Sequence, residues 1–94
     1  MAVYRITRFA APDMDKLNAF AEGARSQIEA AGAISIDVVS YGNGKGVVLA
    51  KYPDQASMDA ATAVSEDVFG AMAAAGLIDG DSIHPHAGVV INSF

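Results

Sequence analysis

The 94-residue sequence contains no cysteine and no tryptophan, and only six of its residues are basic. Without cysteine, the chain has no disulfide framework, no thiol nucleophile and no cysteine-ligated metal site, and its redox compartment stays open. The six basic residues are scattered among eleven acidic ones, which gives a net charge of −5. Because nucleic-acid binding requires a concentrated basic patch, we expect no nucleic-acid partner.

Long hydrophobic runs are also missing. The apolar stretches fall far short of the ~20 residues that a membrane-spanning helix needs, so we expect no membrane association. The first residues carry no basic segment followed by an apolar one, which predicts no secretory signal and a cytoplasmic location. The hydrophobic fraction is 52%, much of it alanine, and the length suits one domain spanning residues 1–94 with a modest core.

The apolar pattern predicts six elements in the order strand, helix, strand, strand, helix, strand. Strands are expected at residues 3–9, 34–41, 46–52 and 83–92, and helical segments at residues 12–31 and 53–77. This order is typical of the ferredoxin-like α+β fold, in which a four-stranded antiparallel sheet carries helices on one face. We expect the strand order 4-1-3-2, with the third strand in the interior of the sheet because it is apolar on both faces.

Turn and cap signals refine this assignment. Asp13 is placed to cap the first helix, and Gly32 to end it. The Gly42-Asn43-Gly44 segment supplies the positive φ angles of a tight hairpin between the second and third strands. Because Ser65 followed by acidic residues is typical of an N-cap, the second helical region is predicted to consist of two short helices meeting near residues 64–65.

Alternation along the strands predicts which side chains share a face. The helices should cover the more apolar face, which consists of Tyr4, Ile6, Ile34, Ile36, Val38, Val47 or Val48, Ile83, Val89 and Ile91. The opposite face then mixes ionisable and apolar groups, namely Arg5, Thr7, Phe9, Ser35, Asp37, Val39, His84, His86, Val90 and Asn92. Apolar groups on this face are poorly placed in water, so we expect a second copy of the sheet to pack over it. The chain is therefore predicted to form a homodimer.

Two segments resemble a known family. Residues 47–58 resemble the third strand and following capped helix of the dimeric α+β barrel superfamily, whose familiar members are the antibiotic-biosynthesis-monooxygenase-like domains. Residues 65–72 resemble the second short helix of that group. The resemblance extends over nearly the whole chain as a pattern of elements. It implies oxygenation or rearrangement of small aromatic or polyketide-like substrates without metal or flavin, whereas other members bind haem or have no known activity.

The most specific local motif is His84-Pro85-His86. Two histidines at positions i and i+2 of a strand point to the same side, with Cα atoms about 6–7 Å apart. Both imidazoles could therefore reach one substrate or one metal ion, and histidine titrates in the range that suits a general base. The alternative is that both residues are solvated at the edge of the sheet. With only two histidines and no cysteine, we expect neither a tightly bound metal nor a cofactor.

Two further polar residues are candidates for catalysis. Asp37 is a carboxylate within an otherwise apolar strand, and it would need a partner if it were buried. Arg5, which is expected on the same face, is the nearest candidate partner. The alternatives are that Asp37 pairs with a histidine or faces water. Asn92 could stabilise a carbonyl or a developing oxyanion. The four candidate catalytic residues are thus His84, His86, Asp37 and Asn92.

These inferences combine into two hypotheses. In the first, the paired sheets of a homodimer enclose a pocket that binds a small organic molecule, and a histidine acts as base in cofactor-free oxygenation or a related proton abstraction. In the second, the chain is a non-catalytic dimerisation or ligand-sensing module. A closed pocket that contains His84 or His86 would favour the enzyme, and a filled interface would favour the module.

Overall fold

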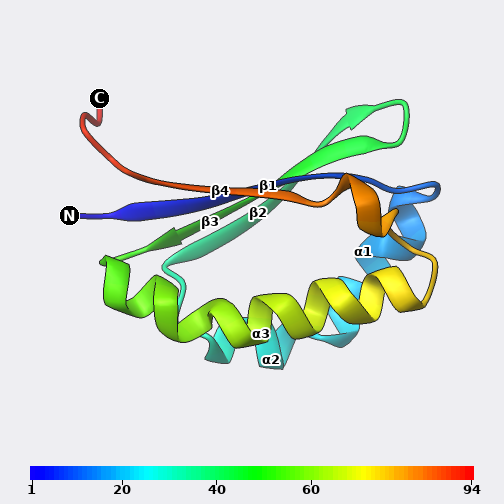
Figure 1. The fold of residues 1–94 in the computed structure, drawn as a ribbon, viewed down its shortest axis with the longest axis horizontal. Helices are drawn as coiled ribbons and strands as arrows, with labels where there is room; N and C mark the ends of the chain where they lie inside the picture. The colour runs from blue at the N-terminus through cyan, green and yellow to red at the C-terminus, as the bar shows by residue number, and fades with distance from the viewer.

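The computed structural model describes all 94 residues and has two layers, a sheet and a set of helices that cover one of its faces (Figure 1). Three helices and a short 3-10 turn connect four antiparallel strands. The elements are β1 (Val3–Ala10), α1 (Met14–Gly23), α2 (Arg25–Ala30), β2 (Ser35–Gly42), β3 (Lys45–Tyr52), α3 (Gln55–Ala74), the 3-10 turn Gly80–Ser82 and β4 (His84–Val89). The predicted ferredoxin-like α+β class is confirmed.

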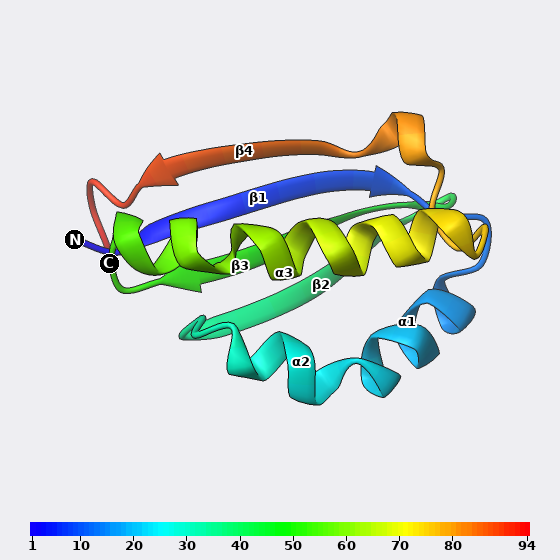
Figure 2. The ribbon, with the colours of Figure 1, turned by 60° about the horizontal axis from the view of Figure 1, so that its bottom comes forward.

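The strands lie in the order β2-β3-β1-β4, which is the predicted order read from the other edge (Figure 2). β3 and β1 form the middle of the sheet, and β2 and β4 form its edges. Pro85 pairs with Thr7 in the register of β1 and β4. Proline has no N–H to donate, so its tolerance here follows from the edge position of β4.

The hairpin between β2 and β3 has the geometry that its glycines predict. Gly42, Asn43 and Gly44 have φ angles of 83°, 56° and 75°. Positive φ at both Asn43 and Gly44 is characteristic of a two-residue type I′ turn, whose twist matches that of the flanking strands. The ladder is shifted between Ser40 and Gly42, which leaves Tyr41 as the extra residue of a bulge.

The helix break was predicted in the wrong region. α3 is one continuous helix of 20 residues, and Ser65 lies inside it instead of capping a second helix. Alanine-rich sequence favours helix strongly enough to continue through Ser65 and Gly70. The break lies instead in the first helical region, between α1 and α2, where Ala24 leaves helical geometry with φ −99° and ψ 6°. Gly23 immediately before it is a weak helix former.

β4 ends earlier than predicted. Its partner strand β1 begins opposite that point and offers no further residue to pair with. Val89 pairs with Val3, the first residue of β1, and the Val90 N–H donates to the Ala2 carbonyl. Beyond this point no strand remains to pair with the chain. The segment that contains Asn92 therefore continues outside the sheet and turns away from the helices (Figure 1).

The two faces of β1 were assigned the wrong way round. Val3, Thr7 and Phe9 are 2%, 2% and 4% exposed and lie under the helices, as does Arg5. The physical reason is that Arg5 finds hydrogen-bond acceptors on α3, so its charge does not force this face outward. The alternate residues Tyr4, Ile6 and Arg8 consequently lie on the face that no helix covers.

The faces of the other strands agree with the prediction. Ile36 and Val38 of β2 lie on the helix side, opposite Ala50 and Val48 of β3. We call the other side of the sheet the helix-free face. It carries Tyr4, Ile6, Arg8, Ser35, Asp37, Val39, Val47, Leu49, Lys51, His84 and His86.

The hydrophobic core is divided into two clusters. One contains Phe9, Ala11, Leu17, Val68, Met72 and Ile78, and the other contains Val3, Ala50, Tyr52, Met58 and Ala61. Small domains usually have one contiguous core. The gap between the clusters is where the candidate site lies.

Gly46 should be intolerant of any side chain. A Cβ at this position would lie 2.6 Å from the Val39 carbonyl oxygen and 2.8 Å from the Phe9 ring. We expect Gly46→Ala to lower the free energy of unfolding by about 2 kcal/mol through overpacking. Gly88→Ala is the matched control in β4, because a Cβ there meets nothing within 4 Å. Equal urea midpoints for the two variants would contradict the prediction.

Candidate functional site

An apolar cavity of about 100 Å³ lies between the sheet and the helices. Seventeen residues line it, and fifteen of them are hydrophobic. They come from both core clusters and from every helix: Phe9, Leu17, Asn18, Ala21, Ile28, Ala31, Ile36, Val38, Val48, Tyr52, Ala61, Val64, Ser65, Val68, Phe69, Met72 and Ile78. An enclosed apolar cavity of roughly 150 Å³ can take up benzene. This space is about two-thirds of that volume and opens toward solvent at Asn18.

Small side chains create the cavity. Ala21, Ala31 and Ala61 occupy positions on the helical segments that face the sheet, where larger residues would normally fill the space. The spacing of apolar residues correctly predicts which face of the helices meets the sheet. Whether the core is completely filled depends on the size of those side chains. Because alanine is too short to reach the sheet, the core is left open between its two clusters.

Two polar residues line the cavity, the exposed Asn18 at its mouth and the half-buried Ser65, and sequence reasoning missed both. Asn18 and Ser65 are the non-hydrophobic members of its lining, and Tyr52 adds a phenol ring. Their spacing was the available signal: Asn18 lies three residues before Ala21, and Ser65 lies four residues after Ala61. Such positions share a helix face. Side-chain amide and hydroxyl groups in an apolar cavity can orient the carbonyl or hydroxyl group of a ligand.

A groove of about 420 Å³ adjoins the cavity between β2 and the helices α1 and α2. The groove and the cavity share the lining residues Asn18, Ala21, Ile28, Ile36 and Val38. A ligand could therefore reach the cavity from the β2 edge of the sheet.

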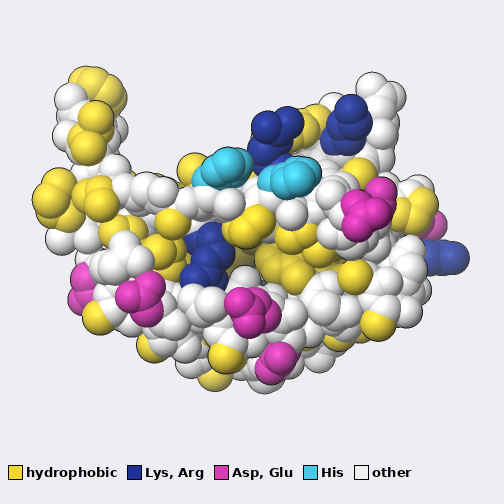
Figure 3. Space-filling model, in the orientation of Figure 1, with side chains coloured by type: hydrophobic (Ala, Val, Ile, Leu, Met, Phe, Trp, Pro, Cys, Tyr) yellow, Lys and Arg dark blue, Asp and Glu magenta, His cyan; other side chains and the backbone are white.

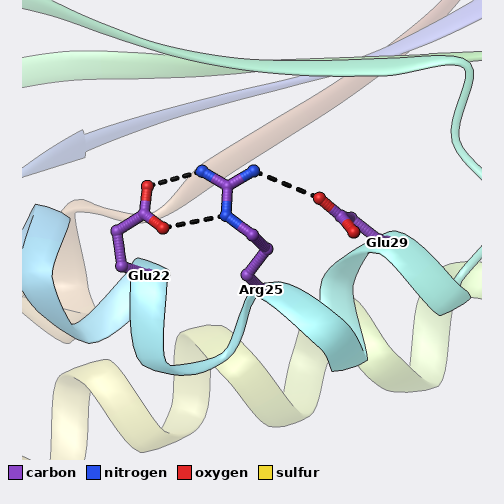
Figure 4. A network of polar contacts seen from close by, with 3 residues as sticks. All are labelled: Glu22, Arg25 and Glu29. Atoms are coloured by element: carbon purple, nitrogen blue, oxygen red, sulfur yellow. Dashed lines mark hydrogen bonds and ion pairs between the residues drawn. The ribbon is translucent and has the colours of Figure 1, made fainter.

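Charged residues at this groove form a small network (Figure 4). The Arg25 Nε donates to Glu22 Oε2 at 2.8 Å, and its Nη1 donates to Glu29 Oε1 at 3.1 Å. Hydrogen bonds from Arg25 and its positive charge lower the pKa of Glu22 and, reciprocally, the two carboxylates raise the pKa of Arg25. All three side chains are exposed, so the network contributes little to stability. It gives the groove an acidic character, to which Asp37 adds a further carboxylate.

His84 and His86 are exposed on the helix-free face of β4. His84 pairs in register with Arg8, and His86 pairs with Ile6. Both lie across the sheet from the cavity, and neither is among its lining residues. The structure therefore places the two histidines together, as their spacing predicts, but apart from Asn18 and Ser65.

Asp37 and Asn92 do not join the histidines in one site. Asp37 is exposed on β2, at the opposite edge of the sheet from β4. The expected ion pair between Asp37 and Arg5 is wrong, because the Arg5 side chain lies on the other face of the sheet and bonds to α3. Asn92 is exposed beyond the end of β4.

No cluster of three or more histidine, aspartate or glutamate side chains is arranged to hold a metal ion. In a separate test, none of the helices combines the length and hydrophobicity that crossing a bilayer requires.

Comparison with known proteins supports the fold. No protein-family model matches the sequence, and neither does any curated protein. Solved structures do match over almost the whole chain. A protein of unknown function from Nitrosomonas europaea has a TM-score of 0.74 at 16% identity, covering 99% of this chain and 92% of the other.

Two further structures carry more informative descriptions. A variant of SnoaB, a cofactor-independent oxygenase from Streptomyces nogalater, has a TM-score of 0.75 at 12% identity, covering 98% of this chain and 95% of the other. A dimeric ferredoxin-like protein from an uncultured marine organism has a TM-score of 0.71 at 16% identity, covering 99% and 98%. The expected likeness to dimeric ferredoxin-like and antibiotic-biosynthesis-monooxygenase-like proteins is confirmed at the level of the fold.

The pKa of the Glu22 carboxyl should depend on its ion pair with Arg25 at the groove. Because Arg25 lowers the pKa of Glu22, the ion pair stabilises the fold above the unfolded-state pKa and is lost as the pH falls through the folded-state pKa. Arg25→Gln should raise the pKa of Glu22 toward its ordinary value of 4.5, as measured by carbon-detected NMR titration. Lys16→Gln removes one positive charge elsewhere on the surface and is the control. A Glu22 pKa that is unchanged by Arg25→Gln would refute the assignment.

Proposed function

We propose that this protein binds a small, uncharged, mainly apolar organic molecule in the cavity between its sheet and helices. The observation that carries the proposal is the division of the core by that cavity. Its lining is almost entirely apolar and it opens toward solvent beside Asn18 and Val38, both of which are exposed. Apolar surface left in contact with water is unfavourable, and an apolar ligand that covers this surface would remove it from water.

The lining and the entrance define the ligand class. The cavity volume suits one aromatic ring or an aliphatic body of similar size. Asn18 and Ser65 can form hydrogen bonds with a carbonyl or hydroxyl group on that ring. The carboxylates of Glu22, Glu29 and Asp37 at the groove outnumber the single cation Arg25, which disfavours entry of anions.

Cofactor-free oxygenation is the activity that the likeness to SnoaB supports. Such chemistry requires a substrate carbanion or enolate, and Asn18 and Ser65 could stabilise its oxygen by hydrogen bonding. No histidine, aspartate or glutamate lines the cavity to act as base. This favours ligand binding without catalysis as the second candidate. A catalytic role for His84, His86, Asp37 or Asn92 stays a prediction that requires a different pocket, completed by a second copy.

We also propose a homodimer that forms through the helix-free face. Ile6 and Val39 are each 37% exposed there, and their register partners on β3 are Leu49 and Val47. The chain exposes 5760 Å², compared with about 5,100 Å² expected for a compact monomer of its mass. The excess is comparable to the roughly 800 Å² that each partner buries in a standard interface.

A substitution that fills the cavity should raise the stability of the fold and abolish ligand binding. We expect Ala21→Leu to raise the melting temperature, because it buries apolar surface, and to abolish binding of phenol, measured by NMR chemical-shift titration. Ala74→Leu, at the exposed end of α3, is the matched control and should bind phenol as the unmodified protein does. Unmodified protein that shows no phenol shifts at millimolar concentration would refute the proposal.

The dimer is tested by placing a charge on the helix-free face. Ile6→Asp should convert the dimer to a monomer at micromolar concentration, as measured by analytical ultracentrifugation, because a buried unpaired carboxylate is costly. Ile34→Asp is the control, since Ile34 is 60% exposed but precedes β2 on the groove side. A monomeric unmodified protein, or equal sedimentation of both variants as dimers, would contradict the proposed interface.

A further inference from the structure

The edge of β2 that faces away from β3 is unpaired and carries few of the features that protect an edge strand. β2 has eight residues and pairs only with β3. Natural edge strands are usually short or carry lysine or proline, so that no other chain adds to the sheet. β2 contains neither residue, and its single charge is Asp37. Its bulge at Tyr41 lies at the hairpin end, so the regular ladder from Ser35 to Ser40 is open to a further strand.

The other edge of the sheet is better protected. β4 has only six residues and includes Pro85, which has no N–H to donate to an added strand. In Figure 3, both histidine side chains (cyan) lie along this edge, with lysine or arginine side chains (dark blue) beside them. A further strand, and above all a basic one, is therefore expected at β2 and not at β4.

The backbone groups of Ile36 and Val38 point to the free edge of β2. Successive residues of an antiparallel strand direct their N–H and C=O groups alternately to one side and to the other. The Val39 carbonyl oxygen lies toward β3, only 2.6 Å from the position that a Cβ on Gly46 would occupy. Val38 and Ile36 therefore present their N–H and C=O groups outward. A residue directly opposite either of them in an added strand would place its side chain in the groove that these two side chains line.

The groove has the shape and polarity that a lysine or arginine side chain requires. These side chains lay an aliphatic stem along apolar surface and keep the charged end in water. The floor of the groove is apolar and is formed by residues of β2 and of the two helices, namely Ala21, Ile28, Ile36 and Val38. The rim is charged, because Glu22, Arg25 and Glu29 extend from α1 and α2 toward the sheet (Figure 4).

The charge of the groove selects the sign of the partner. The three carboxylates of Glu22, Glu29 and Asp37 and the one guanidinium of Arg25 leave a local charge of −2. Arg25 bonds to only one oxygen of Glu29, which leaves the other for a second cation. A second copy of this chain is disfavoured as the occupant, because pairing of two β2 edges would bring two acidic grooves together.

We propose that the free edge of β2 binds an extended peptide segment with lysine or arginine at alternate positions. The segment pairs its backbone with Ile36 and Val38, and its basic side chains lie along the groove toward Glu22 and Glu29. In this mode of recognition, main-chain hydrogen bonds supply affinity, and the pockets for alternate side chains supply specificity. The site goes beyond the proposed function, because it needs no ligand in the cavity and lies on the side of the sheet that the proposed dimer does not cover.

The test uses the hexapeptide acetyl-Thr-Lys-Val-Lys-Val-Thr-amide, in which both lysines fall on one side of the strand. We expect it to shift the amide resonances of Val38 and Glu29 in NMR titrations. It should bind at least tenfold more tightly than the same peptide with glutamate in place of lysine. It should also bind at least tenfold more tightly than a version N-methylated at both lysines, which keeps the charge but loses the N–H groups that face β2.

A matched pair of protein variants tests the groove. Glu29→Gln should weaken binding of the lysine peptide severalfold, because it removes one carboxylate from the rim. Glu66→Gln makes the same change of charge at an exposed position of α3 and should bind as the unmodified protein does. Equal weakening by the two variants would mean that only the net charge matters, and would overturn the proposal.

Hydrogen exchange of the Ile36 and Val38 amides identifies the occupant of the edge. Both amides should exchange rapidly in the free protein and slowly once the lysine peptide is added. Protection that is already present without peptide would mean that a second copy pairs there. That result, equal binding of the lysine and glutamate peptides, full binding of the N-methylated peptide, or no shifts at millimolar peptide would each overturn the proposal. A protein that binds phenol but shows no preference for the lysine peptide refutes this site alone.

Discussion

The size of the side chains between the sheet and the helices is the constraint on which the rest of the structure depends. Ala21, Ala31 and Ala61 hold the helical layer in place without filling the space beneath it. The main contacts between the layers are made by α3 with β1 and β3, and α2 packs against α3. Because the layer is supported mainly along one line, the core separates into two clusters and a cavity remains between them.

The position of α3 also explains why the two halves of the helix side differ. A helix is about 10 Å across and strands are spaced about 4.8 Å apart, so one helix covers roughly two strands. α3 covers the central pair, and α1 with α2 lies toward β2, which leaves β4 uncovered (Figure 2). The half of the sheet near β2 therefore has an apolar cavity between it and the helices. The half near β4 has no helix over it.

Sequence reasoning predicted the elements that depend on local signals. The hairpin at Asn43, the cap at Asp13 and the edge position of Pro85 each follow from the chemistry of one or two residues. It failed where the outcome depends on contacts distant in sequence. The reversed faces of β1 are one example, because Arg5 is accommodated by acceptors on α3 more than fifty positions later. The cavity is another, because periodicity locates a helix stripe without revealing the volume it leaves unfilled.

The reversed faces of β1 also explain why the candidate site in the structure differs from the predicted one. Strand alternation and the apolar character of Tyr4 and Ile6 predict Arg5 on the same side of the sheet as Asp37, His84 and His86. The structure instead separates them: His84 and His86 lie on the helix-free face, and Arg5 lies beneath α3. Two solvated histidines need no partner, so their spacing alone does not locate a site. The half-buried Arg5 instead finds its partners on α3, where Nη2 donates to the Met58 carbonyl and to Thr62 Oγ1.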